Sequence, residues 1–255
     1  MQPSIPRSLV KRILGADPRL FLAARQLVYR LGGSVFRTEA EWLSCIFGNR
    51  KGVFFLQIGA NDGASDDSIY PFVRINSWRG ILVEPVKYLF DRLIANYSGV
   101  NGVAFENKAL TEHDGKQIFY RLKETADALP GWYDQIGSLK LDVVLSHQVA
   151  IPNIGDYLVE EEVECISFGT LVSRHGVTAI DLILIDTEGY DLNILKTIDF
   201  DRFHPKLVIY EQKHLSISDK AEASRLLRSK GYVVHSIGAN NAATRTAFWT
   251  AGYWR

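Results

Sequence analysis

Short apolar runs that alternate with helical stretches constrain the fold of this chain more than any other feature of its sequence. From Lys51 onward these runs are rich in β-branched and aromatic residues, as expected for strands buried on both faces of a sheet. The five clearest runs are Val53–Ile58, Gly80–Val83, Gly102–Phe105, Leu182–Ile185 and Leu207–Tyr210. Because parallel strands need long crossover connections, the alternation predicts a doubly wound α/β fold with a mostly parallel sheet.

Two further runs complete a predicted sheet of seven strands. Helical spacing from Ser218 to Lys230 stops at Gly231, and the runs Tyr232–Ile237 and Thr246–Thr250 follow it. A chain of 255 residues is long enough to bury such a sheet between two layers of helices.

A long insertion, from about Glu112 to Thr170, separates the third and fourth predicted strands. Within it, Gln117–Leu122 has the pattern of an extra strand. Long insertions at the functional edge of a sheet usually shape a binding site or form a lid. We therefore expect this insertion to shape the site of the protein.

The N-terminal segment differs from the rest of the chain in charge. Residues 1 to 37 carry seven Lys or Arg and the single acid Asp17, and apolar residues recur at helical spacing from Leu20 to Leu31. A second short helix is predicted over Glu39–Phe47. We interpret residues 1–50 as a helical extension and residues 51–255 as the main domain. The basic amphipathic helix could pack as a cap, dock a second subunit or lie on a membrane surface.

Charge and cysteine content exclude several classes of protein. The 29 basic residues balance the 29 acidic ones, so no global field favours a nucleic acid partner. Cys45 and Cys165 lack the spacing of a disulfide framework or a zinc site. No apolar run approaches the roughly 18 residues of a transmembrane helix. We therefore expect a cytoplasmic protein with no transmembrane segment and no nucleic acid partner.

The first predicted strand runs into a glycine turn. Gly59 and Gly63 let the backbone turn sharply and let a ligand approach the main chain. The Gly-x-x-x-Gly spacing is not the dinucleotide fingerprint, which makes NAD or FAD a poor fit. Glu84 ends the second strand 25 positions after Gly59, and an acid there can accept hydrogen bonds from both ribose hydroxyls of a nucleoside. An exposed loop carboxylate is the alternative interpretation of Glu84.

Acidic residues also follow the fourth and fifth predicted strands. Asp186 and Glu188 come directly after one, and Glu211, followed by His214, ends the other. Ligands of open parallel sheets gather at the carboxyl ends of the strands, so we expect these side chains to face a cleft. The alternative is that the acids cap the helices that follow. No ligand spacing demands a metal, although Asp186, Glu211 and His214 could together hold Mg²⁺ or Mn²⁺.

Five segments have the order and spacing seen in a known family. They are Gln57–Gly63, Gly80–Pro85, Asn107–Leu110, Asp181–Gly189 and Tyr210–Glu211. Together they resemble the FkbM family of S-adenosylmethionine-dependent methyltransferases over about residues 54 to 215. Gln57 departs from the family, which more often has Asp there. A Gln carbonyl can still accept a hydrogen bond from a water or from the methionine ammonium.

The resemblance implies a Rossmann-like class I methyltransferase fold and an S-adenosylmethionine pocket at the glycine turn and Glu84. It implies transfer of a methyl group to a hydroxyl of a small-molecule or glycan acceptor, such as a sugar or a secondary metabolite. The cofactor-binding residues it implies are Gln57, Gly59, Ala60, Asn61, Asp62, Gly63, Asp67, Glu84, Pro85, Asn107 and Asp186. Residues 38 to 255 carry 22 basic and 28 acidic residues, a net charge of −6 that is compatible with this cationic cofactor.

An alcohol is a poor nucleophile while it is protonated, so we expect a general base near the acceptor. The candidate catalytic residues are Asp186, Glu188, Glu211 and His214, among which the base is not assigned. In the insertion, Trp132, Tyr133 and His147 offer flat faces on which a sugar could rest, unless they belong to the core.

Two other functions remain open. The first is a binding or scaffold module that keeps the nucleoside pocket without turnover, a hypothesis that Gln57 favours. The second is a nucleotide-sugar enzyme, which would need basic residues for a diphosphate, and the glycine turn offers none nearby.

Overall fold

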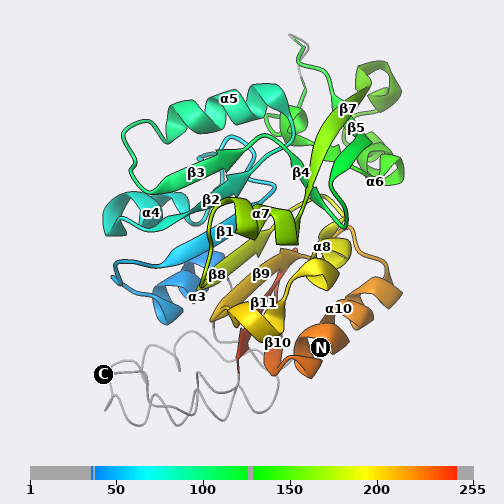
Figure 1. The fold of residues 1–255 in the computed structure, drawn as a ribbon. Coiled ribbons are helices and arrows are strands. Elements are labelled where there is room, and N and C mark those ends of the chain that lie inside the picture. The colour runs from blue at the N-terminus through cyan, green and yellow to red at the C-terminus, as the bar shows by residue number, and fades with distance from the viewer. Residues whose placement is uncertain (1–35, 37, 126–128, 246–255) are drawn as a thin grey trace, which may run out of the picture.

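The computed structural model describes residues 36, 38–125 and 129–245 and shows a seven-stranded sheet with helices on both sides (Figure 1). Its strand order is β10-β11-β9-β8-β1-β2-β3. The strands are β1 (Phe54–Ile58), β2 (Arg79–Val83), β3 (Val103–Glu106), β8 (Leu182–Ile185), β9 (Leu207–Glu211), β10 (Tyr232–Ile237) and β11 (Asn240–Arg245). Strands β3, β2, β1, β8 and β9 pair in parallel, whereas β11 is antiparallel to both of its neighbours. The predicted doubly wound, mostly parallel sheet is confirmed.

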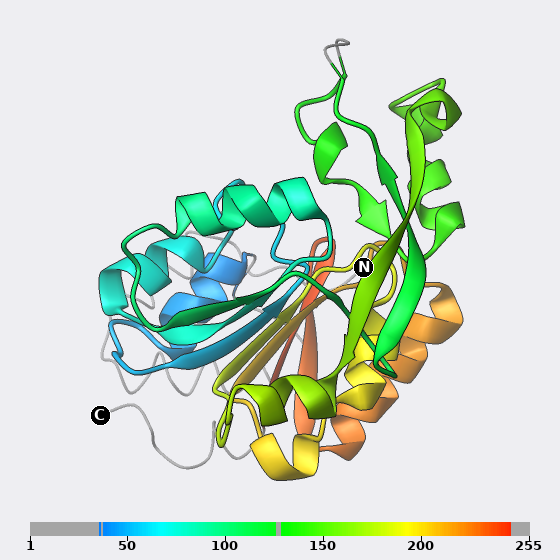
Figure 2. The same cartoon turned by 45° about the horizontal axis from the view of Figure 1, so that its top comes forward.

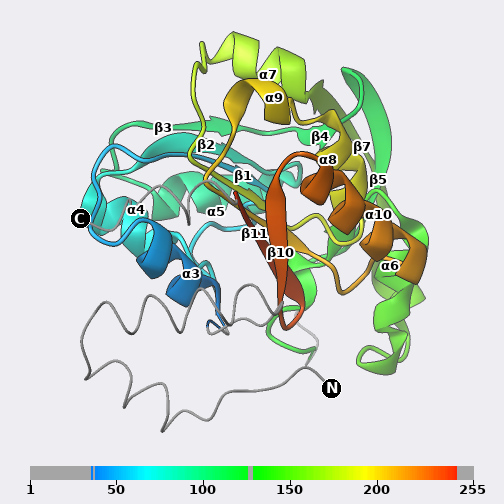
Figure 3. The ribbon, with the colours of Figure 1, turned by 90° about the horizontal axis from the view of Figure 1, so that it is seen from below.

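Among the described residues, seven helices cover the two faces of this sheet, and Figure 3 shows the sheet from below with helices on either side. One face carries α3 (Glu39–Ile46), α4 (Tyr70–Asn76) and α5 (Lys87–Asn96). The other carries α7 (Phe168–Arg174), α8 (Asp191–Thr197), α9 (Phe200–Phe203) and α10 (Ile217–Ser229). The crossover helices place the carboxyl ends of the parallel strands at one edge, which is where ligands bind in such sheets.

The core has two halves because successive strand residues point to opposite faces. In β1, Leu56 and Ile58 join the cluster under α7 to α10, and Phe55 joins the cluster under α3 to α5. All three are at most 1% exposed. Burial of both faces explains why the central strands are continuous apolar runs in the sequence.

The closing strand lies earlier in the chain than the sequence pattern predicted. After β10, Gly238 turns with φ +81° and the chain returns at once as β11, with Ile237 opposite Asn240. The predicted strand Thr246–Thr250 lies outside the described residues, as does the predicted helix from Leu20 to Leu31. We missed β11 because its polar and small residues lack the apolar pattern of a strand, although it is buried between β9 and β10.

The segment between β3 and β8 builds a second, four-stranded sheet that stands away from the first (Figure 2). Its order is β4-β7-β5-β6. The strands are β4 (Ala109–Thr111), β5 (Gly115–Leu122), β6 (Gly137–Ser138) and β7 (Leu158–Ser167). Helix α6 (Leu141–Ser146) and the 3₁₀ turns η1 (Tyr133–Gln135), η2 (His147–Val149) and η3 (Ile154–Tyr157) connect them. One apolar cluster, around Leu122 and Val144, lies wholly within this segment, and a second joins the segment to α5 through Leu89.

The predicted second N-terminal helix is present as α3. Thr38 caps it, accepting a hydrogen bond from the Glu41 amide, while the Glu41 side chain accepts one from the Thr38 amide. Trp42 and Leu43 anchor α3 in the core. The division into an extension and a main domain stays a prediction. Within the described ranges, no helix combines the length and apolar character needed to cross a bilayer.

Candidate functional site

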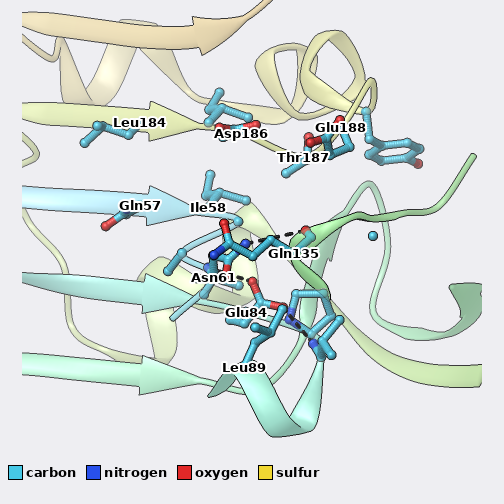
Figure 4. Close-up of a pocket in the computed structure, with 18 of the residues that line it drawn as sticks. Gln57, Ile58, Asn61, Glu84, Leu89, Gln135, Leu184, Asp186, Thr187 and Glu188 are labelled. Carbon is cyan, nitrogen blue, oxygen red and sulfur yellow. Dashed lines mark hydrogen bonds between the residues drawn. The ribbon is translucent and has the colours of Figure 1, made fainter. Parts of the chain in front are cut away.

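The carboxyl ends of β1, β2 and β8 open into a cavity of about 560 Å³, within the range of small-molecule sites (Figure 4). The inserted segment supplies another wall. Its lining residues are Phe119, Trp132, Gln135, Ile136, Gly137, Leu139 and His147. The cavity therefore lies between the glycine turn, the acidic strand ends and the insertion.

The glycine turn after β1 passes directly against the end of β8. Gly59 has φ +77°, and a Cβ added to it would lie 1.7 Å from the backbone oxygen of Asp186. Gly63 has φ +70°, and its Cβ would lie 2.2 Å from a methyl carbon of Leu93. Between them, Asn61 adopts φ +52°. The two glycines are thus required by close packing as well as by their backbone angles.

Glu84 points inward at the end of β2 and joins the glycine turn. Its Oε2 accepts a hydrogen bond from the Asn61 amide at 2.9 Å, and its Oε1 accepts one from the Val86 amide at 2.8 Å. Burial raises the pKa of Glu84 to about 7, and the two amide bonds oppose this shift. Each carboxylate oxygen keeps a second lone pair for a ligand. Glu84 is therefore a buried acceptor beside the cavity, not an exposed loop carboxylate.

Asn107 supports Glu84 from outside the cavity lining. Its side-chain amide lies 2.9 Å from the carbonyl oxygens of both Glu84 and Pro85, and donates to them. Asp62 is also a local support, since its carboxylate accepts from the amides of Ala64 and Ser65. Burial opposes ionisation of Asp62, but hydrogen bonds from Ser65 and Ala64 lower its pKa overall.

Gln57 lines the cavity and has a buried acceptor without a partner among the described residues. Its Nε2 donates to Asp67 at 2.9 Å, which orients the amide, and its Oε1 is buried with no hydrogen-bond partner among the described residues. Asp67 also accepts from the amides of Ile69 and Tyr70, yet burial raises its pKa. A buried carbonyl oxygen without a donor loses free energy, so this site favours a ligand that donates a hydrogen bond.

Asp186 follows β8 and lines the cavity on the side opposite Glu84 (Figure 4). Protein surrounds it, but its side chain can be reached from within the cavity. Burial raises the pKa of Asp186 well above its ordinary value, and the nearby acids Asp191, Glu188 and Glu39 raise it further. Its carboxylate has no hydrogen-bond partner in the described part of the chain. Asp186 is thus suited to face a cation or to accept a proton.

Glu188 lies two residues further on, close to two histidines. Its Oε2 is 2.9 Å from Nε2 of His214, and that nitrogen is 3.9 Å from Oε1 of Glu211. The His147 ring centroid is 5.2 Å from that of His214. Burial opposes ionisation of Glu188, but His214 lowers its pKa overall. Glu211 lies behind this group, where burial raises its pKa to about 9 and the acids Asp186, Glu188 and Asp191 add to the shift.

Two residues of the site were not predicted. Asp191 is fully buried, accepts from the Thr187 hydroxyl and the Glu211 amide at 3.0 Å each, and holds the ends of β8 and β9 together. Its position in the sequence, shortly after Asp186, could have indicated that it belongs to the site. Glu39 lines the cavity from the start of α3, with Asn240 and Ser68 donating to its carboxylate. No local pattern indicated Glu39, because only packing brings α3 to this edge.

The structure brings most of the predicted site residues to the cavity. Those that line it are Gln57, Gly59, Ala60, Asn61, Asp67, Glu84, Pro85, Asp186 and Glu188. Those outside the lining are Asp62, Gly63, Asn107, Glu211 and His214. Of the three aromatic residues proposed from the insertion, Trp132 and His147 line the cavity. Tyr133 packs instead against a local core and bonds to the backbone of Thr125.

The charge of the lining fits a cationic cofactor. It contains six carboxylates and two lysines, and Lys108 is already paired with Glu164 outside the cavity. The acidic members are Glu39, Asp66, Asp67, Glu84, Asp186 and Glu188. S-adenosylmethionine carries a sulfonium, an ammonium and a ribose diol. A negative lining, an unpaired Gln57 oxygen and the Glu84 acceptor match these groups.

Solved structures with similar folds include three methyltransferases. A methyltransferase FkbM from Methylobacillus flagellatus KT is 13% identical with a TM-score of 0.48, over 93% of this chain and 57% of its own. A methyltransferase from Geobacter sulfurreducens is 13% identical with a TM-score of 0.43, and the match covers 96% of this chain and 99% of that structure's chain. A SAM-dependent methyltransferase from Aquifex aeolicus is 10% identical with a TM-score of 0.38, and the match covers 94% of this chain and 97% of that structure's chain. This chain thus spans little more than half the length of the first.

No curated protein sequence matches the chain significantly. A family model, the methyltransferase FkbM domain, matches residues 57–234. That match runs from Gln57 at the end of β1 to Val234 in β10, and so includes the glycine turn, Glu84, the insertion and the acidic strand ends. With a Rossmann-like sheet and a cavity at the carboxyl ends of its strands, the chain belongs to the FkbM family of S-adenosylmethionine-dependent methyltransferases.

Proposed function

We propose that this protein transfers a methyl group from S-adenosylmethionine to a hydroxyl of a sugar, a glycan or a secondary metabolite. The observation that carries the proposal is Glu84, a buried carboxylate joined to the glycine turn at the edge of the cavity. Its free lone pairs suit the two ribose hydroxyls, which are neighbouring donors.

Other lining residues suit the remaining parts of the cofactor. The unpaired Oε1 of Gln57 would accept from the methionine ammonium, and Asp67 holds Gln57 in that orientation. Asp186 and Glu188 add negative charge near the positive sulfur. When bound, S-adenosylmethionine supplies a methyl group on a sulfonium, which makes that carbon electrophilic.

Asp186 is the residue we assign as general base. Among the candidate catalytic carboxylates, it is the one that lines the cavity and has no hydrogen-bond partner in the described ranges. Its pKa is raised toward neutral pH, which suits a general base. In this role its carboxylate takes the proton of the acceptor hydroxyl. Trp132 and His147 line the insertion side, where their rings offer flat faces for a sugar.

Calorimetry with S-adenosylmethionine and with S-adenosylhomocysteine tests the cofactor part of the proposal. We expect micromolar binding to the wild-type protein and at least tenfold weaker binding to Glu84→Ala, because two charge-assisted hydrogen bonds are lost. Circular dichroism checks that the variant is folded. Glu160→Ala, at an exposed position of β7, is the matched control. A folded wild-type protein that binds neither compound would refute the proposal.

Asp186→Asn separates an enzyme from a non-catalytic nucleoside-binding module. The variant is tested for S-adenosylhomocysteine formation with a panel of sugars, glycans and polyhydroxylated metabolites. An enzyme should lose roughly 100-fold or more of its turnover while it still binds the cofactor. A wild-type protein that binds the cofactor but turns over with no member of the panel would favour the scaffold function.

A further inference from the structure

A group of three side chains at the insertion side of the cavity has the composition of a transition-metal site. His147, Glu188 and His214 each place one ligand atom within 4.8 Å of the other two, and they form the one such group among the described residues. They come from three segments: the η2 turn of the insertion, the loop after β8 and the loop after β9. From this geometry we infer that the three residues bind a divalent first-row transition-metal ion.

Buried polar atoms at the centre of the group support the inference. Nε2 of His214 and Oε2 of Glu188 are buried and lie 2.9 Å apart as an ion pair, but among the described residues neither atom has an aligned hydrogen-bond partner. Oε2 of Glu211, beside them, is buried without a partner in the same part of the chain. Leaving the Glu211 oxygen unsatisfied costs free energy, and a cation among these three side chains would interact favourably with both carboxylates and with the imidazole.

His147 is oriented as a metal ligand would be. Its Nδ1 lies 3.2 Å from the carbonyl oxygen of Val143, and because a carbonyl can only accept, Nδ1 carries the proton. Nε2 is then left with its lone pair free, the tautomer that metal-binding histidines adopt when a backbone carbonyl holds the other nitrogen. The Trp132 ring lies next to His147, with 5.8 Å between the ring centroids.

The backbone around Glu188 is held in an unusual conformation. Glu188 has φ +48°, rare for a residue with a side chain, and its carbonyl oxygen accepts from the Ser138 hydroxyl at 2.7 Å. The next residue, Gly189, has φ +92°, and a Cβ there would lie 2.9 Å from Val143 and 3.3 Å from His214. Residues from the insertion and from the β9 loop thus fix the turn that aims Glu188 at both histidines.

The ligand set selects the class of ion. Two imidazoles and one carboxylate suit Zn²⁺, Fe²⁺, Co²⁺ or Mn²⁺, whereas Mg²⁺ prefers oxygen ligands throughout. This set differs from the group Asp186, Glu211 and His214 considered from the sequence for Mg²⁺ or Mn²⁺. Ligand atoms about 2.1 Å from an ion lie roughly 3 to 4 Å apart, so small side-chain movements from the observed spacing suffice.

Three protein ligands leave coordination positions open on the side of Glu188 and His147 that lines the cavity. An acceptor hydroxyl bound there would lose its proton more readily, and Asp186 could take it. This role rests on the proposed function, whereas metal binding itself does not.

Titration of the metal-free, untagged full chain with Co²⁺ tests the inference by visible absorption, with Zn²⁺ as competitor. We expect one equivalent to bind with the absorption bands of a protein-bound ion, and Zn²⁺ to abolish them. His147→Ala, His214→Ala and Glu188→Gln should each weaken binding at least tenfold. His113→Ala, at an exposed histidine outside the group, should leave it unchanged.

Thermal melting and S-adenosylmethionine binding are measured on the same samples. His147 is half-buried on a surface turn, so His147→Ala should stay folded and should melt close to the metal-free wild type. Failure of the wild type to bind one equivalent of Co²⁺, or binding that the His147 and His214 variants leave intact, would overturn the inference. A protein that binds the metal but not the cofactor would instead refute only the proposed function.

Discussion

The backbone amide of Asn61 donates a hydrogen bond to the carboxylate of Glu84, 23 residues later, at a distance of 2.9 Å. This bond connects the glycine turn after β1 to the end of β2, across the edge of the sheet where the cavity opens (Figure 4). Asn61 makes this bond with φ +52°, in the left-handed region of the backbone. The residue proposed to bind ribose is thus already oriented before any ligand arrives.

Binding of S-adenosylmethionine should release a proton from Glu84 near pH 6. Burial raises the pKa of Glu84 to about 7, and only the ionised carboxylate can accept from both ribose hydroxyls. Affinity should therefore fall as the pH drops below about 7, by up to tenfold per unit. Calorimetry at pH 6 in two buffers with different ionisation enthalpies measures the released proton. Glu84→Gln should reduce the release, and equal values for this variant and the wild type would contradict the prediction.

Gly59→Ala should destabilise the protein far more than Gly99→Ala. The two glycines have nearly the same φ, +77° and +78°, but a Cβ would meet the Asp186 oxygen at Gly59 and nothing within 4 Å at Gly99. We expect a loss of about 1 kcal/mol in the free energy of unfolding for Gly99→Ala, and about 2 kcal/mol or more beyond that for Gly59→Ala. Urea unfolding measures both. Equal losses would show that the close approach costs nothing.

Gln57→Leu should weaken S-adenosylmethionine binding by roughly tenfold or more, because the ammonium would lose its acceptor. Methylthioadenosine, which lacks the amino acid part of the cofactor, should bind the variant as tightly as it binds the wild type. Glu84→Ala should instead weaken the binding of both compounds. Calorimetry with the six pairs of protein and ligand tests this, and a loss of methylthioadenosine affinity in Gln57→Leu would contradict the assignment.

Asp191 should make the protein less stable as the pH rises from about 4 to about 7. Burial raises its pKa from 3.8 to about 7, so folding favours the protonated form. The stability that this form contributes is complete below pH 3.8 and is lost as the pH rises to the folded pKa, by up to about 1.4 kcal/mol per unit. Urea unfolding at several pH values should show a flatter dependence for Asp191→Asn.

The matched control for this prediction is Asp156→Asn, which changes an exposed aspartate. It should keep the pH dependence of the wild type. In Asp191→Asn the new amide can still accept from the Glu211 backbone and can donate to Thr187, so the fold should survive. If Asp191→Asn kept the pH dependence of the wild type, a group other than Asp191 would be responsible for that dependence.

Most of the features predicted correctly from the sequence came from patterns among residues that are close together in the chain. The central strands are buried on both faces, so each is an apolar run visible within one short window. The glycine turn and the acids after β8 could be recognised for the same reason. Strand β11 was missed because a strand of polar and small residues, buried by its neighbours, has no such local pattern.

The sequence by itself determined the parallel sheet, the edge at which a ligand binds and the residues of the first turn, because these depend on local patterns and on the direction of parallel strands. Only the tertiary structure decided that Glu39 of α3 and His147 of the insertion reach this edge, and that Glu188 faces two histidines. Those contacts join segments separated by tens of residues. They depend on how helices and loops pack, which no local pattern encodes.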